Sequence, residues 1–183
     1  MKKFKLIFLL SILLLSSCSV AQIAPVRQDG VAVPVEESPQ NEEVNQPAEL
    51  GSAALAALTE FYHSLNQGRY DRAVELYGGS YEELTYFNPT IDPSDMAELL
   101  RAACEMNGFM CLSILSSELV QADNQQEIFF ELEFANPDGS LFILGPCCGA
   151  DEETMPPVSV FNVQVSCEDE GLCQVLDLPP WVP

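Results

Sequence analysis

Apolar residues in the first half of the chain's globular region recur every three to four positions, which is the spacing of one face of a helix. The pattern predicts helices over residues 49–66 and 70–77, and a third helix that ends at Asn107-Gly108. Asp92 is the expected N-cap of the third helix and Pro93 its first residue, since proline is favoured there. The positions that carry the pattern are Ala54, Leu58, Phe61, Leu65, Tyr70, Ala73, Val74, Tyr77, Met96, Leu99, Leu100 and Ala103.

From Cys111 onward the apolar spacing changes to two, which is typical of strands with one buried face. The clearest example runs from Ile128 to Phe134, where every second residue is a large hydrophobe and Glu131 and Glu133 lie between. Asn136-Pro137-Asp138-Gly139 has the composition of a turn. The strands expected are residues 111–122, 128–134, 141–144, 158–167 and 172–178.

Helices followed by a run of antiparallel strands predict an α+β fold, with three N-terminal helices packed on one face of a curved antiparallel sheet. Residues 49–183 are enough for one domain of this kind. The chain is 48% hydrophobic, which supplies a core.

Residues 1–17 have the composition of an export signal. Three lysines stand in the first five residues, and an apolar run follows over residues 6–15. That run is shorter than the ~20 residues that span a bilayer, and it matches the core of a signal peptide. Leu15-Ser16-Ser17-Cys18 then resembles the bacterial lipobox. This resemblance implies cleavage before Cys18 and attachment of diacylglycerol and a fatty acid, such as palmitate, to that cysteine.

Ser19-Val20-Ala21 offers the alternative of an ordinary cleaved signal peptide. The cysteine count favours lipidation, because setting Cys18 aside leaves six of the seven cysteines, an even number suited to disulfides. We therefore expect a lipoprotein anchored in the cell membrane or the outer membrane and facing away from the cytoplasm. Several acyl chains make such an anchor durable.

Residues 18–48 follow as an acidic, proline-containing stretch without aromatic residues, a composition typical of a disordered linker. The expected organisation is a signal peptide over residues 1–17, a lipid-anchored linker over residues 18–48, and one α+β domain over residues 49–183.

Charge narrows the choice of partners. Removal of residues 1–17 leaves four arginines and no lysine against 28 acidic residues, a formal net charge of −24. Nucleic acid is excluded as a partner, because phosphate binding requires clustered basic residues. The lack of clustered basic residues also argues against electrostatic docking on anionic lipid. The expected contact with the membrane is therefore the lipid on Cys18.

The segment Phe61-Tyr62-His63-Ser64-Leu65-Asn66-Gln67-Gly68-Arg69-Tyr70-Asp71 and the helix after it resemble the opening of the nuclear transport factor 2/ketosteroid isomerase superfamily. The order of helices before sheet also matches. The resemblance implies a cone-shaped α+β fold over roughly residues 50–178, with a cavity that takes a small apolar ligand and a sheet face on which a second copy or another protein can dock. Phe61, Tyr62, Phe130 and Phe134 are the residues that we assign to this cavity.

In the isomerases of that superfamily a tyrosine of the first helix donates to an enolate oxygen and an aspartate acts as base. Tyr62 matches the tyrosine, but this sequence has no aspartate at the early strand position, and Asn88 and Asp92 are poor substitutes. A tyrosine on an apolar helix face is more often part of the core. We therefore assign no catalytic residue.

Other polar candidates favour a structural interpretation. His63 is the chain's one histidine, and we expect it on the surface. Asp151-Glu152-Glu153 and Glu168-Asp169-Glu170 lack the alternating ligand order of a calcium loop. We predict no metal site and no cofactor.

The six remaining cysteines allow 15 pairings. Cys104–Cys111 is expected where the third helix meets the first strand, and Cys167–Cys173 across the last hairpin. In a sheet that runs as a meander, Cys147 and Cys148 fall at the far end, so they are expected to bond to each other. Two roles remain open for that pair: a structural lock on the loop, or a redox-sensitive or soft-metal site.

These features together predict a non-catalytic module of the cell envelope that binds a small apolar ligand or an envelope protein, or pairs with a second copy through its sheet face. The alternative is a small-molecule hydrolase or isomerase that works in the cone cavity. The lack of a paired acid and base favours the first interpretation.

Overall fold

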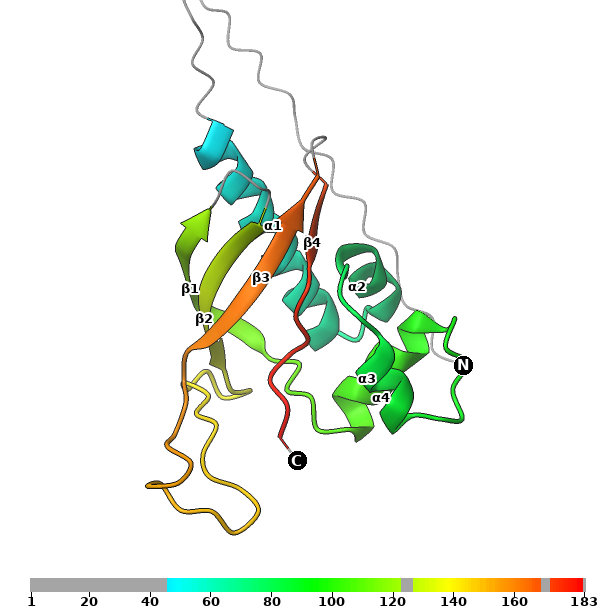
Figure 1. The fold of residues 1–183 in the computed structure, drawn as a ribbon, viewed down its shortest axis with the longest axis vertical. Coiled ribbons are helices and arrows are strands. Elements are labelled where there is room, and N and C mark those ends of the chain that lie inside the picture. The colour runs from blue at the N-terminus through cyan, green and yellow to red at the C-terminus, as the bar shows by residue number, and fades with distance from the viewer. Residues whose placement is uncertain (1–45, 123–126, 169–171, 183) are drawn as a thin grey trace, which may run out of the picture. The chain divides into compact units, whose positions relative to one another are not determined.

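The computed structural model describes residues 46–122, 127–168 and 172–182, all of which belong to one structural unit, Glu42–Pro183. The signal peptide, Cys18 and most of the linker lie outside the described residues. Within them the chain has an α+β fold, as predicted, with helices first and an antiparallel sheet after them (Figure 1).

The sheet contains β1 (Ser113–Ala122), β2 (Glu127–Ala135), β3 (Phe161–Cys167) and β4 (Cys173–Val175) in sequence order, each antiparallel to its neighbour. β2 has an alternating burial pattern, which confirms the period-two prediction. Its buried side chains face the same way as the buried side chains of β3 and β4. The inner face of the sheet consists of Ile128, Phe130, Leu132, Phe134, Val163, Val165, Cys167, Cys173 and Val175.

α1 (Gln46–Asn66) packs against β1, β3 and β4 and also contacts α2 (Tyr70–Leu76) and α4 (Met96–Met106). Its predicted apolar face is buried, because Ala54, Leu58, Phe61 and Leu65 all point into the core. Figure 1 shows α1 crossing the sheet on one face. The contact ends at a polar link, where Asn66 donates to the Cys111 carbonyl at 3.1 Å and accepts from the Ser113 hydroxyl at 3.1 Å.

The structure has a fourth helix that the sequence prediction omits. α3 (Glu82–Phe87) is a short helix between the second and third expected helices, where the sequence pattern predicts no element. Only Leu84 of this helix is buried, so the stretch contains too few apolar positions to show a helical period.

The predicted start of the third expected helix, which is α4 in the structure, is wrong by about one turn. Asp95, not Asp92, is the N-cap, and its carboxylate accepts from the Glu98 amide at 3.1 Å. Asp92 instead accepts from the amide and the hydroxyl of Ser94, at 2.9 and 2.8 Å, in a local turn. Aspartate serves both as helix cap and as turn residue, so Asp92-Pro93 fits either role.

Residues 141–144 do not form the predicted strand. Leu141 makes an isolated bridge to Ala135, and Leu144 makes another to Val158, while β2 pairs directly with β3. The segment therefore does not run back along the sheet. It stays near the end of β2 that pairs with Ser113, so the expected placement of Cys147 and Cys148 at the opposite end from Cys111 is wrong.

Two disulfides and a backbone hydrogen bond fasten the junctions of the fold and its C-terminal segment. Disulfides join Cys104 to Cys111 and Cys167 to Cys173, the two pairs expected at the helix–strand junction and across the hairpin. The C-terminal segment pairs with the turn after α4, because Val182 donates to the Gly108 carbonyl at 2.9 Å. Gly108 has a φ of 79°, and a Cβ there would lie 2.2 Å from the Val182 oxygen, so glycine is required.

Candidate functional site

The four residues predicted to line a cavity all belong to the packed core. Phe61, Tyr62, Phe130 and Phe134 are all buried, and the Tyr62 ring lies 5.3 Å from Phe61 and 4.9 Å from Phe134 between centroids. These are ordinary distances for aromatic pairs in a core. The space between α1 and the inner face of the sheet is filled by these side chains.

Tyr62 has one unusual property. Its hydroxyl is buried and has no hydrogen-bond partner among the described residues. Burial raises the pKa of the Tyr62 phenol far above its ordinary value, with smaller contributions from Asp177 and Tyr77. An unpartnered buried hydroxyl is unfavourable in a folded protein, so this group calls for an explanation, as does the Tyr81 hydroxyl, which is also buried without a partner among the described residues.

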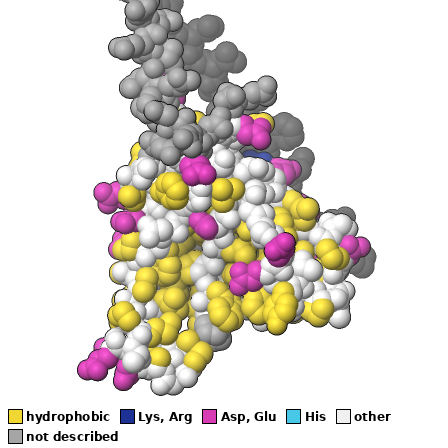
Figure 2. All heavy atoms as spheres, viewed as in Figure 1, with side chains coloured by type: hydrophobic (Ala, Val, Ile, Leu, Met, Phe, Trp, Pro, Cys, Tyr) yellow, Lys and Arg dark blue, Asp and Glu magenta, His cyan; other side chains and the backbone are white. Residues whose placement is uncertain are grey.

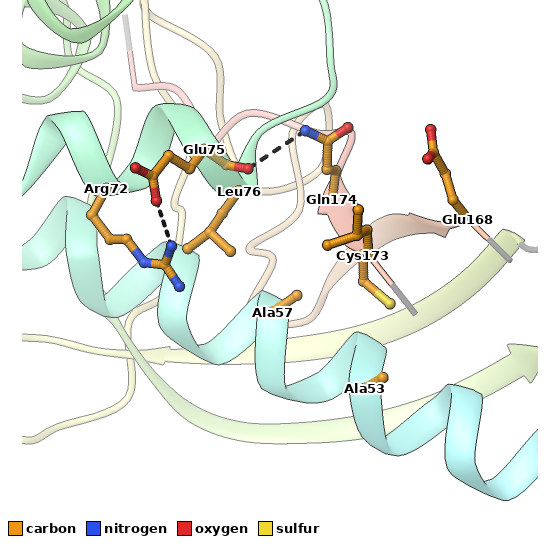
Figure 3. A pocket seen from close by; sticks show the side chains of 9 residues that line it. Ala53, Ala57, Arg72, Glu75, Leu76, Glu168, Cys173 and Gln174 are labelled. Atoms are coloured by element: carbon orange, nitrogen blue, oxygen red, sulfur yellow. Dashed lines mark hydrogen bonds and ion pairs between the residues drawn. The ribbon is translucent and has the colours of Figure 1, made fainter. Parts of the chain in front are cut away.

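A groove of about 540 Å³ lies beside the buried face of α1, between that helix, α2 and β4. Ala53 and Ala57 form its floor, and their small side chains leave the space open. Figure 3 shows Arg72 and Glu75 toward one end of the groove and Glu168 at the other. The remaining lining residues are Leu76, Leu172, Cys173 and Gln174.

Charges at the rim of the groove are arranged around one arginine. Arg72 forms an ion pair with Glu75, and its Nε lies 3.8 Å from a carboxylate oxygen of Glu60. Glu60 also accepts from Arg69 at 3.3 Å. Arg72 is therefore already neutralised within the protein, and Glu168 makes the opposite rim acidic.

All three arginines in the described part of the chain form ion pairs, since Arg101 pairs with Glu98 and Glu105. Figure 2 shows acidic side chains scattered over the face in view, separated by hydrophobic ones. The surface therefore favours neutral or cationic partners over anionic ones.

Polar candidates from the sequence lie apart from the groove, with one exception. His63 is exposed, as predicted. Asp151 lies in an exposed loop, where hydrogen bonds from Thr154 lower its pKa. Asn88 is buried and donates to the Leu84 carbonyl and the Asn107 side chain, so it is structural. The exception is Glu168; its neighbours Asp169 and Glu170 lie outside the described residues.

The third cysteine pair is present as thiols. Cys147 is half-buried and Cys148 is exposed, and their sulfur atoms lie 2.8 Å apart without a disulfide. The pKa of the Cys147 thiol is raised, mainly by the hydrogen bond with Cys148 and to a smaller extent by burial. A trans peptide holds neighbouring Cα atoms about 3.8 Å apart, below the usual range for a disulfide, which opposes closure of this pair.

Sequence reasoning missed the groove. Its floor is made of alanines beside the predicted helix face, and its walls come from a short helix and a three-residue strand. The one available signal was the run from Ala53 to Ala57, where small residues surround Leu55. Small residues on a second helix face mark a place where that face is either closely packed or left open.

No protein-family model matches the chain, and no curated protein matches it. In the described segments, no helix is both long enough and apolar enough for a bilayer crossing. The same segments bring no three histidine, cysteine or acidic side chains together in a way that could hold a metal ion. Geometry defines two surface hollows of similar volume among the described residues, this groove and one of about 530 Å³ lined by Tyr81, Glu82, Thr85, Tyr86 and Pro93. We take the groove as the candidate site because residues of α1, α2 and β4 together line it.

Proposed function

We propose that this chain is a lipid-anchored module of the cell envelope that faces away from the cytoplasm and binds a ligand or a partner protein without catalysing a reaction. The observation that carries the proposal is the contrast between a filled core and an open groove on the same helix. The predicted interior cavity is occupied by aromatic side chains, whereas the groove offers about 540 Å³, within the range of ligand sites.

The lining of the groove indicates what it would hold. Ala53, Ala57, Leu76 and Leu172 supply apolar contact, and Glu75, Glu168 and Gln174 supply hydrogen-bond acceptors at the edges. An amphipathic occupant with an apolar body and neutral or cationic ends would fit both the apolar contacts and the acceptors at the edges. Arg72 is unsuited to capture an anion, because it is already paired with two carboxylates.

Native mass spectrometry of the mature protein, purified from membranes in mild detergent, tests this proposal. We expect a retained molecule on the wild type and on Ala56→Trp, and its loss from Ala57→Trp. Ala56 is exposed on the same helix but does not line the groove, so it is the matched control. Thermal unfolding of both variants checks that they fold. Retention by Ala57→Trp would rule out the groove as the site.

The lipid anchor is tested separately. The motif at residues 15–18 supports lipidation of Cys18. Cells fed an alkyne fatty acid should label the wild type and Ser19→Ala, and should leave Cys18→Ala unlabelled and released from membranes. A Cys18→Ala protein that fractionates with membranes as the wild type does would contradict the lipoprotein assignment.

A homodimer through the sheet face is less compatible with the charges there. Glu118 of β1 lies opposite Glu131 of β2, and Glu133 is the next acidic residue on the same face. A second copy would bring these carboxylates against their own equivalents, which is unfavourable. We therefore favour a different protein or a small ligand as the occupant.

One observation favours the alternative, a hydrolase or isomerase with the cone-shaped architecture of the nuclear transport factor 2-like superfamily. The unpartnered Tyr62 hydroxyl is a hydrogen-bond donor buried between α1 and the sheet. If Tyr62 is part of the core only, Tyr62→Phe will leave stability unchanged or raise it by about 1 kcal/mol, because an orphan hydroxyl is removed. A stability loss above about 2 kcal/mol would show that the hydroxyl has a partner.

A further inference from the structure

Cys147 and Cys148 lie in a closed loop that projects from the sheet. The loop spans residues 145–157, and two hydrogen bonds between Leu144 and Val158, of 2.8 and 2.9 Å, close its base. Figure 1 shows this segment extending beyond the strands. The pair is thus accessible from outside while the base of the loop stays fixed.

The backbone at the pair is strained in a specific way. The Ala150 amide donates to the Cys147 carbonyl at 2.9 Å, and the two residues between them, Cys148 and Gly149, have φ values of 59° and 88°. Two successive positive φ values are the pattern of a type I′ turn. Across the described segments Cys148 is the one non-glycine residue with positive φ. Such outliers are concentrated at functional sites.

Metal binding does not fit the pair. Two thiolates on a tetrahedral zinc ion would stand about 3.8 Å apart, given zinc–sulfur bonds of about 2.3 Å, and two more ligands would be required. Asp151, the nearest acid along the chain, is engaged by the amide and hydroxyl of Thr154. The sulfurs at 2.8 Å are instead nearer to the ~2.05 Å of a covalent disulfide.

The other cysteines cannot take part. Cys104 is bonded to Cys111, and Cys167 to Cys173. Among the cysteines of the described residues, Cys147 and Cys148 therefore have only each other as a free partner. Any further partner is an external thiol or disulfide compound.

We propose that Cys147 and Cys148 form a reversible dithiol–disulfide site that exchanges electrons with low-molecular-mass disulfides and thiols, such as those of the glutathione class. The thiolate of one cysteine attacks a sulfur of the external disulfide, forms a mixed disulfide and releases one external thiol. The thiolate of the neighbouring cysteine then attacks the protein sulfur of that mixed disulfide, forms the Cys147–Cys148 bond and releases the second thiol. The protein loses two electrons and two protons, and the external disulfide gains them.

Reversibility follows from the covalent geometry. Neighbouring Cα atoms are about 3.8 Å apart, whereas ordinary disulfides span about 4.4–6.8 Å. A strained and exposed disulfide is easier to reduce than a buried one. Cys167 and Cys173 are buried, so their disulfide provides an internal reference on the same molecule.

Redox titration of the full mature protein in detergent tests the proposal. The protein is equilibrated in mixtures of reduced and oxidised glutathione, alkylated, and cleaved after glutamate, which releases peptide 134–152 with Cys147 and Cys148 as its only cysteines. We expect this peptide to switch between a doubly alkylated form and a form two hydrogen masses lighter than the dithiol. The switch should reverse on return to reducing mixtures. The ratio of squared reduced glutathione to oxidised glutathione at which half of this peptide is oxidised should be at least about tenfold lower than the ratio for Cys167–Cys173.

The variant Cys147→Ser provides the mechanistic control. Without its neighbour, Cys148 should accumulate as a mixed disulfide with glutathione, because no second thiol displaces it. The proposal is overturned if peptide 134–152 stays doubly alkylated, or glutathionylated, in oxidising mixtures that keep both other disulfides formed. It is equally overturned if the Cys147–Cys148 bond resists reduction after the other two have opened.

Discussion

Two faces of α1 differ in how closely they are packed. One face carries Leu58 and Phe61 into a core where side chains touch on every side, and the other carries Ala53 and Ala57 to the floor of a groove. The same helix thus contributes large buried side chains to the core and, beside them, small side chains to an open groove. Large side chains fix the first face in place, and small ones leave the second face free to bind.

The largest contrast is expected between two leucines of that helix. Leu58 is fully buried and Leu55 is 37% exposed. Leu58→Ala should lower the free energy of unfolding by about 3 kcal/mol, since it leaves a cavity in the core. Leu55→Ala should change it by about 0.5 kcal/mol or less. Urea unfolding followed by circular dichroism measures both, and equal losses would show that α1 is not fixed by one face.

The next effect concerns the disulfide beside the groove. Removing it with Cys167→Ala/Cys173→Ala should cost about 2 kcal/mol, because a short loop in the unfolded chain is no longer constrained. The matched double variant Cys147→Ser/Cys148→Ser should cost about 0.5 kcal/mol or less, as these side chains are not in the core. Midpoints of urea unfolding compare the two. A larger loss from the loop variant would mean that the loop pair has a structural role.

A smaller effect is expected at alkaline pH from the tyrosines around the core. Burial raises the pKa of Tyr81 to about 12 from an ordinary value of 10.0, and burial also raises the pKa of Tyr62 and Tyr77. Above pH 10 the unfolded chain loses phenolic protons that the folded chain keeps. Stability should therefore be complete below pH 10 and fall as pH rises toward 12.

Melting temperatures between pH 8 and 11.5, with tyrosinate absorbance recorded in parallel, measure this fall. Residues 18–183 contain no lysine, so in protein of that range lysine titration does not obscure the fall. Tyr81→Phe should make the decline shallower. A melting temperature that is constant up to pH 11.5 would contradict the buried placement of these phenols.

Much of the fold could be predicted from residue spacing. The 3.6-residue period identified α1, α2 and the body of α4, and the two-residue period identified β2, because in each case large hydrophobes mark a buried face. α3 was not predicted because a single buried residue gives no helical period. Residues 141–144 were misassigned because a short apolar run fits an isolated bridge as well as a strand.

The site was less accessible to sequence reasoning. Aromatic residues such as Phe61 and Phe134 were assigned to a cavity by resemblance, but whether aromatic side chains line a space or fill it depends on how closely helix and sheet approach. The groove depends on Ala53, Glu75 and Gln174, which are far apart in sequence and have no shared pattern. The cysteine pairs at Cys104–Cys111 and Cys167–Cys173 were predictable because short separations across a junction or hairpin restrict the geometry.

The most direct test of the account is the occupancy of the groove in living cells. In a Cys147→Ser/Cys148→Ser background, Ala57→Cys and Ala56→Cys are labelled with a small maleimide, first in intact cells or spheroplasts and then in purified protein that has been unfolded, dialysed and refolded to remove any bound molecule. The account predicts that Cys substituted at position 57 reacts at least about tenfold more slowly in cells than in the stripped protein, while position 56 reacts alike in both. Equal reactivity of position 57 in the two states would contradict the claim that the groove holds a partner.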